Sequence, residues 1–357
     1  MNIAAMTKLY FAPYMWYKKR VFYKNSIALV KRYTKNDKAL TSEQKKKIAD
    51  FYAPYGKMPT IFHAYYVEKT GYFSEKYLPT SVWVNNVDDY YNDRYGARMM
   101  DNKCYYPKLF PGIPQADTIA CRTNGIWVDA HDQLLDETTL TALVNAEPAV
   151  FVKKATNSFG GKGVQYIDAK DSNAYKTLKD FCTGTSEDVV VQRPLKQHAA
   201  LAAINESSVN TIRVLSLLSE DGVKIYSSVL RMGIGSAKVD NASSGGVTCG
   251  ITPEGKLKKT AYKPSGEKYE AHPTSGVVFD GYAIPGIHQV WDLVKVAHPM
   301  VPHFRLVSWD FAINEEGHPV MIEANLNLGE LDFHQLNNGP VFGEDTKKIL
   351  DEVFGKK

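Results

Sequence analysis

The sequence predicts an α+β protein with more than one lobe, and three observations carry this prediction. The chain has 357 residues, which exceeds one average domain and is long enough for two or three lobes. Residues 1–100 show helical spacing of apolar side chains between Pro and Gly breaks. From residue 118 onward, short apolar runs typical of strands are separated by turn residues. Helices followed by strands favour the α+β class.

Residues 1–100 are predicted to form a helical N-terminal lobe that is rich in Tyr and Lys. A helix start is indicated at Thr41, because Gln44 follows three places later as in a capping box. Pro and Gly residues between residues 54 and 79 divide the rest of the lobe into short helices. We find no catalytic constellation in this region.

The positive charge of the chain is concentrated near its N-terminus. The net charge is +4, but residues 1–50 hold twelve Lys or Arg against three Asp or Glu, so this segment is +9 and the remainder −5. Aromatic residues are interleaved with the cations, a pattern that suits an anionic bilayer surface or a nucleic acid. A helical lobe with solvated lysines is the alternative. Because the basic excess stops near residue 50, we expect no nucleic-acid partner, while peripheral membrane association through residues 1–50 stays open.

The composition is that of an ordinary globular chain, with 44% hydrophobic and 23% charged residues. No run approaches the roughly 18 apolar residues of a membrane span, and the N-terminus lacks the pattern of a secretory signal. The cysteines lie far apart in the sequence, without the paired spacing of zinc or redox sites. We therefore expect a cytoplasmic protein, with the inner face of the membrane as the alternative.

A strand, a glycine-rich loop and a second strand follow one another between residues 149 and 167. The first strand ends on Lys153, and the loop starts at Ser158 and reads SFGGKG. Its glycines let backbone N–H groups approach phosphate oxygens, and its lysine adds charge. The spacing matches neither a Walker loop nor a dinucleotide motif, and a flexible hairpin tip is the alternative. The candidate phosphate-binding residues are Lys153, Ser158, Gly160, Gly161, Lys162 and Gly163.

Two apolar strands joined near Asp221-Gly222 carry an arginine each, Arg213 and Arg231. A guanidinium group on an apolar strand is costly to bury unless it meets an anion. Both arginines are therefore candidates for binding phosphate or carboxylate, and structural ion pairs are the alternative. The polar, glycine-rich loop at residues 240–246 follows and is suited to closing over a substrate.

The segment from Leu306 to Leu328 is predicted to be a half-buried β-hairpin, because apolar residues alternate on both sides of Glu316-Gly317. A two-residue turn at Glu316-Gly317, the commonest hairpin connection, determines the register of the two strands. The expected cross-strand pairs are Phe311 with Ile322, Ile313 with Val320 and Asp310 with Glu323.

This register brings two carboxylates together and places Asn325 on the same face as Glu323. Adjacent carboxylates repel and raise each other's pKa unless a cation lies between them. Mg²⁺ is the cation that such oxygen ligands favour, and a solvent-facing hairpin with incidental acids is the alternative. We expect Asp310→Asn and Glu323→Gln to abolish turnover and leave the fold intact, because the acids would repel in the absence of a metal.

The order of these pieces resembles the ATP-grasp superfamily and, within it, the sugar-transfer-associated branch, which is linked to cell-surface polysaccharide biosynthesis. The resemblance covers about residues 101–340, and its most specific parts are NTIR at Asn210 and E-x-N at Glu323. It implies an ATP-grasp fold in which two α+β subdomains, residues 101–194 and 195–357, grip the nucleotide. The helical residues 1–100 precede them and match that branch only loosely.

The resemblance implies ATP and Mg²⁺ as cofactors and gives each candidate residue a role. Lys153 and the loop at residues 158–163 would bind the phosphates, and Arg213 and Arg231 would neutralise the γ-phosphate and the intermediate. Adenine and ribose would lie against Gln192, Arg193, Leu195 and His198. Asp310, Glu323 and Asn325 would bind Mg²⁺, and Asn241 would help to shape the acceptor pocket. The sequence departs from many relatives at Lys154, where they have proline, and at Gln192, where they have glutamate.

These features together predict an ATP-dependent carboxylate–amine ligase that forms an acyl phosphate and releases ADP. The link of the sugar-transfer-associated branch to polysaccharide biosynthesis implies that one substrate is a sugar carboxylate, an amino sugar or an amino acid. A kinase of the same fold, which phosphorylates a hydroxyl, is one alternative. The other is a nucleotide-binding scaffold recruited to a membrane by residues 1–50. Loss of vesicle association with unchanged activity after removal of that segment would support membrane recruitment.

Overall fold

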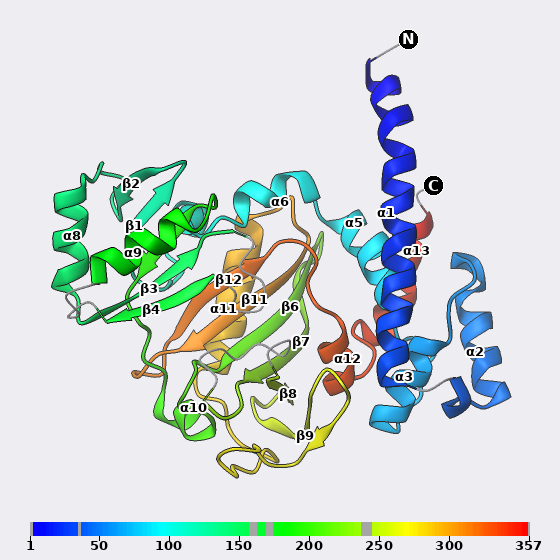
Figure 1. Cartoon of the computed structure of the whole chain (residues 1–357). Helices are drawn as coiled ribbons and strands as arrows, with labels where there is room; N and C mark the ends of the chain where they lie inside the picture. Colours follow the sequence, from blue (N-terminus) through cyan, green and yellow to red (C-terminus); the bar gives the residue numbers. More distant parts are fainter. Residues whose placement is uncertain (1–2, 35–36, 157–162, 169–173, 237–244, 356–357) are drawn as a thin grey trace. The chain divides into compact units, whose positions relative to one another are not determined.

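The computed structural model describes residues 3–34, 37–156, 163–168, 174–236 and 245–355, and the chain divides into two compact units (Figure 1). The helical unit comprises Met1–Tyr91, Ser265–Glu267 and Glu330–Lys357. The two-sheet unit comprises Asn92–Pro264 and Lys268–Gly329. The C-terminal segment thus clusters with the N-terminal residues, whereas the sequence analysis grouped it with residues 195–329.

The helical unit confirms the predicted helical N-terminal region. The capping box forms as expected, because Gln44 N donates to Thr41 Oγ1 over 3.1 Å and Thr41 N donates to Gln44 Oε1 over 2.9 Å. Gly71 ends its helix with φ of 76°, a left-handed conformation that glycine adopts without strain. The helices are α1 Ile3–Tyr33, α2 Ser42–Tyr52, α3 Ile61–Thr70, α4 Thr80–Val82, α5 Asp89–Tyr91, α12 Asp332–Asn338 and α13 Thr346–Gly355. Among the helices described, none is long and apolar enough to cross a membrane.

Some of the tyrosines of this unit, among them Tyr66 and Tyr77, lie in its core. Tyr66 and Tyr77 stack with ring centroids 4.5 Å apart, and both side chains are fully buried. The Tyr66 hydroxyl donates to Asp332 Oδ1 over 2.9 Å, and Thr80 Oγ1 donates to the same oxygen over 2.8 Å. Burial raises the pKa of Asp332, and these two donors supply the hydrogen bonds that a buried carboxyl needs.

The smaller sheet of the two-sheet unit has the strand order β2-β1-β5-β3-β4 in the described part of the chain. Its pairs are antiparallel, and its apolar side chains pack with those of two helices in one buried cluster. The strands are β1 Thr118–Thr123, β2 Ile126–Asp129, β3 Ala149–Lys154, β4 Val164–Asp168 and β5 Val189–Gln192, and the helices are α8 Glu137–Ala146 and α9 Ala174–Thr183. The strands at residues 149–154 and 164–168 lie where the sequence analysis expected them, whereas it predicted no helix at the position of α9.

The larger sheet has the strand order β10-β9-β8-β7-β6-β11-β12, also antiparallel among the described residues. Helix α11, Ile287–Ala297, contributes Val290 and Val294 to the same buried cluster as apolar side chains of the sheet, such as Val214. The strands are β6 Thr211–Ser219, β7 Gly222–Met232, β8 Val247–Ile251, β9 Leu257–Tyr262, β10 Lys268–Tyr269, β11 Leu306–Ile313 and β12 Pro319–Asn325. The remaining helices of this unit are α6 Arg94–Met100, α7 Tyr106–Leu109 and α10 Ala199–Ile204.

The β11–β12 hairpin confirms one predicted pair and corrects two. Asp310 lies opposite Glu323 as expected, but Phe311 pairs with Met321 and Ile313 with Pro319. The loop is one residue longer than a two-residue turn, because Asn314 N donates to His318 O and the Asn314 side chain accepts from His318 N. A bulge between Asp310 and Phe311 shifts the register back by one residue. The two shifts cancel, so the carboxylates still meet.

The β6–β7 hairpin also differs slightly from expectation. Ser219 pairs with Gly222, so the turn residues are Glu220 and Asp221, one position earlier than predicted. Gly222 has φ of 100°, a conformation that disfavours other residues. The antiparallel pairing of the two arginine-bearing strands is confirmed.

Candidate functional site

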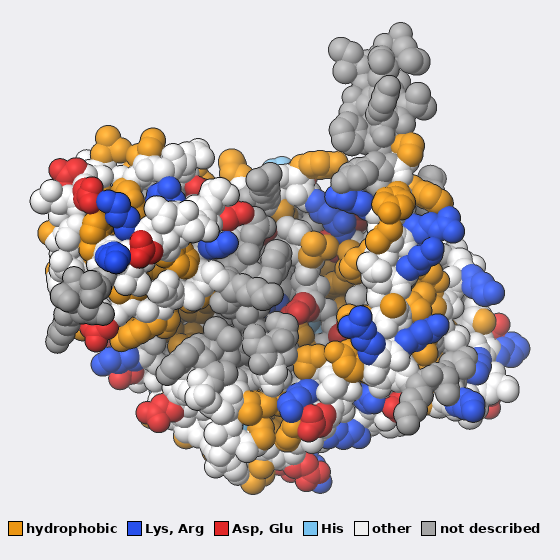
Figure 2. All heavy atoms as spheres, viewed as in Figure 1, with side chains coloured by type: hydrophobic (Ala, Val, Ile, Leu, Met, Phe, Trp, Pro, Cys, Tyr) orange, Lys and Arg blue, Asp and Glu red, His pale blue; other side chains and the backbone are white. Residues whose placement is uncertain are grey.

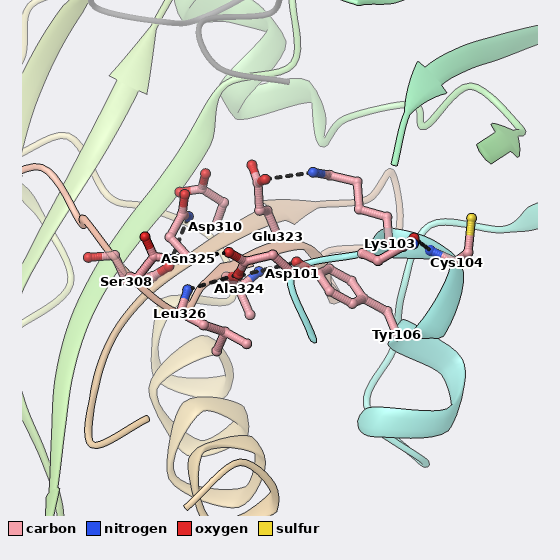
Figure 3. A network of polar contacts seen from close by, with 12 residues as sticks. Asp101, Lys103, Cys104, Tyr106, Ser308, Asp310, Glu323, Ala324, Asn325 and Leu326 are labelled. Carbon is pink, nitrogen blue, oxygen red and sulfur yellow. Dashed lines mark hydrogen bonds and ion pairs between the residues drawn. The ribbon is translucent and has the colours of Figure 1, made fainter. Parts of the chain in front are cut away.

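The candidate site lies on one face of strands β11 and β12 (Figure 3). Asp310 and Glu323 are cross-strand partners, and Ser308 and Asn325 are the next pair along the same face. The Asn325 Nδ2 group donates to the backbone oxygen of Ser308 over 3.0 Å. Side chains of the alternate positions, such as Trp309, belong to the apolar cluster that also contains side chains of α11. The period of two along each strand therefore separates a polar face from the core.

Asp310 is held by the two arginines that the sequence analysis singled out. Arg213 lies opposite Asp310 on the neighbouring strand β6 and binds both carboxylate oxygens, with Nη2 to Oδ2 at 2.8 Å and Nε to Oδ1. Arg231 Nη1 donates to Oδ2 over 3.0 Å. Burial alone would raise the pKa of Asp310, but the two guanidinium groups outweigh it and hold the pKa below its ordinary value. The cluster carries a formal charge of +1.

Glu323 has a different cationic partner, Lys103, which the sequence analysis did not identify. Lys103 Nζ lies 2.6 Å from Glu323 Oε1, and the lysine side chain is only 8% exposed against 32% for the glutamate. Lys153, at the end of β3, interacts electrostatically with both Lys103 and Glu323. Burial and the neighbouring Lys103 lower the pKa of Lys153 to about 8, while Glu323 acts in the opposite direction. Two lysines and a carboxylate thus share one part of the site.

The segment from Asp101 to Tyr106, which we call the bridge segment, holds β12 in place. The Tyr106 hydroxyl is buried and makes hydrogen bonds of 3.2 Å to both the N–H and the C=O of Ala324. The Asp101 carboxylate accepts from Leu326 N and from Asn327 Nδ2, at 3.3 and 3.0 Å. The residues on either side of Ala324 are Glu323 and Asn325, so the bridge segment positions both candidate ligands.

The same segment is bonded to the smaller sheet. Lys103 N donates to Ala155 O over 3.1 Å, directly after β3. Asn102 Nδ2 donates to Asp188 Oδ2 over 2.7 Å, and Cys104 Sγ lies 3.7 Å from Val189 O at the start of β5. The bridge segment therefore links the strand that bears Lys153 to the strand that bears Glu323.

The glycine-rich loop falls mostly outside the described residues. This applies to Ser158, Gly160, Gly161 and Lys162, and also to Asn241 of the later loop. Gly163 is described, with φ of 80°, and a Cβ there would meet the Lys154 side chain at 2.7 Å. Lys154 N donates to Gly163 O over 2.8 Å, a bond that a proline at position 154 would lose.

The adenine and ribose candidates have structural contacts of their own. The side chain of Gln192 donates to Thr118 Oγ1 over 3.3 Å, and β5 is an interior strand rather than a sheet edge. Arg193 donates to Glu147, with Nη2 2.6 Å from the carboxylate. His198 Nδ1 accepts from Ala200 N at the start of α10 over 3.1 Å. Leu195 is partly buried. The structure brings the metal candidates and the arginines together but gives Arg193 and His198 other partners.

The oxygen donors of the site suit a hard cation. Among the described residues, no three or more His, Cys, Asp or Glu side chains group together as metal ligands, so the candidate set depends on an amide. Glu323 uses Oε1 for Lys103, and Asn325 uses its nitrogen for Ser308. In the part of the chain that the structure describes, the second Glu323 oxygen and the Asn325 amide oxygen accept no hydrogen bond. Carboxylate and amide oxygens are ligands that Mg²⁺ accepts.

Comparison with known proteins decides the family. The model of the sugar-transfer associated ATP-grasp family matches residues 85–350. The chain belongs to this family. Its fold is accordingly the ATP-grasp fold, and the matched region contains both sheets and the bridge segment. The resemblance noted from the order of the motifs is thus confirmed. No protein with curated annotation matches the sequence.

Solved structures similar to this chain include three of low sequence identity. D-alanyl-alanine synthetase A from Vibrio cholerae is 14% identical with a TM-score of 0.42, over 72% of this chain and 66% of its own. The biotin carboxylase domain of 2-oxoglutarate carboxylase from Hydrogenobacter thermophilus is 13% identical with a TM-score of 0.44, over 74% and 47%. The ATP-grasp ligase PsnB, complexed with a minimal precursor, is 15% identical with a TM-score of 0.41, over 75% and 64%. The chain spans about half to two thirds of these structures.

Proposed function

We propose that this protein is an ATP-dependent carboxylate–amine ligase, with its nucleotide phosphates bound beside Glu323, Lys103 and Lys153. The observation that carries the proposal is the pairing of Asp310 with Glu323 on neighbouring strands, each with its own cation. Membership of the sugar-transfer associated ATP-grasp family supports ATP as the nucleotide. It also motivates a substrate that is a sugar or an amino acid used in cell-surface polysaccharide biosynthesis.

Mg²⁺ fits the donor set, with Glu323 and Asn325 as the residues that would hold it. Asp310 is the next carboxylate, but both its oxygens already accept from guanidinium groups, so we assign it to holding the arginines. When bound, the cation would neutralise part of the phosphate charge. We therefore assign Mg²⁺ binding to Glu323 and charge balance of the arginines to Asp310, because the two acids have different partners.

The side chains of the chain itself would act mainly by charge and position. Lys103 and Lys153 would contact phosphate oxygens, and the ion pair of Lys103 with Glu323 limits the motion of both groups. The net positive cluster of Arg213, Arg231 and Asp310 would stabilise an anionic intermediate at short range. Ligation through an acyl phosphate needs no cysteine or serine nucleophile.

The proposed reaction proceeds in two displacements. A substrate carboxylate oxygen attacks the γ-phosphorus of ATP, and the bond between this phosphorus and the β,γ-bridging oxygen breaks. ADP departs, and the substrate is now an acyl phosphate. The nitrogen of an amine then attacks the acyl carbon, inorganic phosphate departs, and the amine loses a proton to give the amide. Positioning two anions in a cationic site is the main demand of this chemistry.

Phosphorus NMR of the purified protein with Mg-ATP tests the proposal. The substrates are pooled sugar acids, amino sugars and amino acids, each class also omitted in turn. Inorganic phosphate and ADP that form only when a carboxylate and an amine are both present support the ligase. A new phosphoester signal would instead identify a kinase. Glu323→Gln is expected to abolish turnover, and Glu315→Gln, an exposed glutamate in the loop of the same hairpin, serves as the matched control.

A further inference from the structure

We propose that the exposed side of helix α1 docks on an anionic lipid surface, with Tyr17, Arg20, Lys24 and Lys31 as its contact stripe. This inference concerns the helical unit and is independent of the proposed ATP chemistry. Helix α1 contains seven Lys or Arg residues and no Asp or Glu. A helix of this composition attracts anionic lipid headgroups without internal competition from acids.

The stripe residues lie on one side of the helix. Their spacings of three, four and seven residues place them on the same face of an α-helix, and all four side chains are exposed. At about 1.5 Å per residue the stripe is roughly 21 Å long. A straight helix of this length can contact a flat bilayer along its whole exposed side.

The other side of α1 packs against the rest of the helical unit. Ser26, Val30 and Thr34 follow at intervals of four residues and are at most 7% exposed. Lys19 lies near the same side, where Nζ donates to Asp89 Oδ2 over 2.6 Å and to Asn85 O over 2.9 Å. One lysine of the helix is therefore structural. The stripe lies on the other side, so changes in it should not disturb the packing of the unit.

Aromatic side chains accompany the cations at the N-terminal end of the stripe. Trp16 and Tyr17 are each 61% exposed, and the Arg20 guanidinium lies 5.1 Å from the centroid of a Trp16 ring. Figure 2 shows hydrophobic side chains among Lys and Arg side chains over the helical unit. Trp and Tyr prefer the bilayer interface, where the ring meets acyl chains and its polar edge stays hydrated.

A lipid surface fits this helix better than a nucleic acid does. Proteins that stack single-stranded bases do so in a basic groove, whereas the stripe runs along the exposed side of one helix. Because no described helix can span a membrane, the expected contact is peripheral. Electrostatic attraction then dominates and must weaken with salt.

Flotation of the full chain with vesicles tests the proposal. We expect binding to vesicles that contain phosphatidylserine and none to vesicles of phosphatidylcholine alone, with release at high salt. The triple variant Arg20→Gln, Lys24→Gln and Lys31→Gln should bind roughly 100-fold more weakly. Trp fluorescence should shift to shorter wavelength on binding, and Trp16→Phe should remove that shift.

The matched control changes three cations on helix α2, Lys45→Gln, Lys46→Gln and Lys47→Gln, and should bind like the unchanged protein. Equal loss in both triple variants would mean that total charge, not the stripe, governs binding, and would overturn the proposal. So would binding of an RNA or DNA fragment that depends on the stripe in the absence of vesicle binding. ATP turnover of the stripe variant, measured without vesicles, should be unchanged, which separates this proposal from that of the ligase.

Discussion

At the scale of single residues, Asp310 and Glu323 have different environments although they face each other. Asp310 is 4% exposed and bonded to two guanidinium groups, while the Glu323 side chain is 32% exposed and paired with one lysine. The two guanidinium groups contradict the expectation that Asp310 is an uncompensated acid. Its negative charge is what makes the burial of Arg213 and Arg231 tolerable.

Asp310→Asn should consequently destabilise the protein by about 3 kcal/mol or more, because two buried guanidinium groups lose their counter-ion. Urea denaturation followed by circular dichroism measures this change. Glu323→Gln is the paired comparison, with a smaller expected loss because its carboxylate is partly solvated and only one cation, Lys103, loses a counter-ion. Asp310→Asn with an unchanged midpoint would contradict the assignment of Asp310 to structural charge balance.

Lys153 makes nucleotide binding depend on pH. Burial and Lys103 lower the pKa of Lys153 to about 8, and bound phosphates favour its charged form and so raise that pKa. ATP affinity should therefore fall as the pH rises through about 8, and binding near that pH should take up a proton. Calorimetry in buffers of different ionisation enthalpy measures both effects.

Lys153→Arg provides the control for this pH dependence. Arginine keeps its charge throughout the accessible pH range, so the variant should bind ATP with little change between pH values below and above about 8. Proton uptake on ATP binding should also disappear in this variant. The assignment fails if the variant retains the full pH dependence of the unchanged protein.

At the scale of elements, the bridge segment determines where β12 presents its ligands. The Tyr106 hydroxyl satisfies both backbone groups of Ala324, and a buried group without a partner costs about 1–3 kcal/mol. Tyr106→Phe should therefore lower the free energy of unfolding by that amount and weaken the Mg²⁺ dependence of ATP binding. Titration of Mg²⁺ against bound ATP measures the second effect.

Tyr105→Phe is the matched control, because Tyr105 is adjacent in sequence and only partly buried. We expect its stability and Mg²⁺ affinity to stay close to those of the unchanged protein. Equal effects of the two substitutions would indicate a general response of this segment and not the specific hydrogen bonds to Ala324.

The strands of the site were predictable from sequence because their apolar periodicity is local. The pairing of Asp310 with Glu323 was correct for a reason that the sequence does not display, since a longer loop and a bulge offset each other. Register depends on turn geometry and on bulges, and both depend on tertiary contacts. The two-residue periodicity of a strand can therefore assign a residue to the correct face of the sheet and still give an incorrect cross-strand partner.

Lys103 was not predicted as a site residue, because the sequence pattern around it does not distinguish it from other lysines. It lies 220 positions from Glu323 in the sequence and follows a helix end in a polar, loop-like context. Sequence periodicity carries no information on contacts of that separation, and a lysine is common on any surface. The asparagine before it caps the short 3₁₀ helix by accepting from Cys104 N, which is a local feature that could have marked the segment as ordered.

At the scale of the whole molecule, the helical unit is built from both ends of the chain. Residues of the C-terminal segment bond to residues of the N-terminal segment within this unit, as between Tyr66 and Asp332 and between Tyr91 and Glu352. Contiguous lobes were the natural expectation from sequence, since composition changes once near residue 100. The amino-acid composition of Glu330–Lys357 does not indicate that this segment belongs to the helical unit.

The packing of the helical unit decides which N-terminal truncation is informative. Removal of residues 1–50 would delete Val30, Leu40 and Ile48, which are at most 5% exposed, and each buried side chain of this kind contributes about 2 kcal/mol. We expect that truncation to lose the near-ultraviolet circular dichroism of the buried tyrosines and to aggregate. Removal of residues 1–15 leaves these side chains and the stripe in place, so it should keep cooperative unfolding, vesicle binding and ATP turnover. A folded protein after removal of residues 1–50 would show that α1 and α2 are dispensable to the core, contrary to their burial.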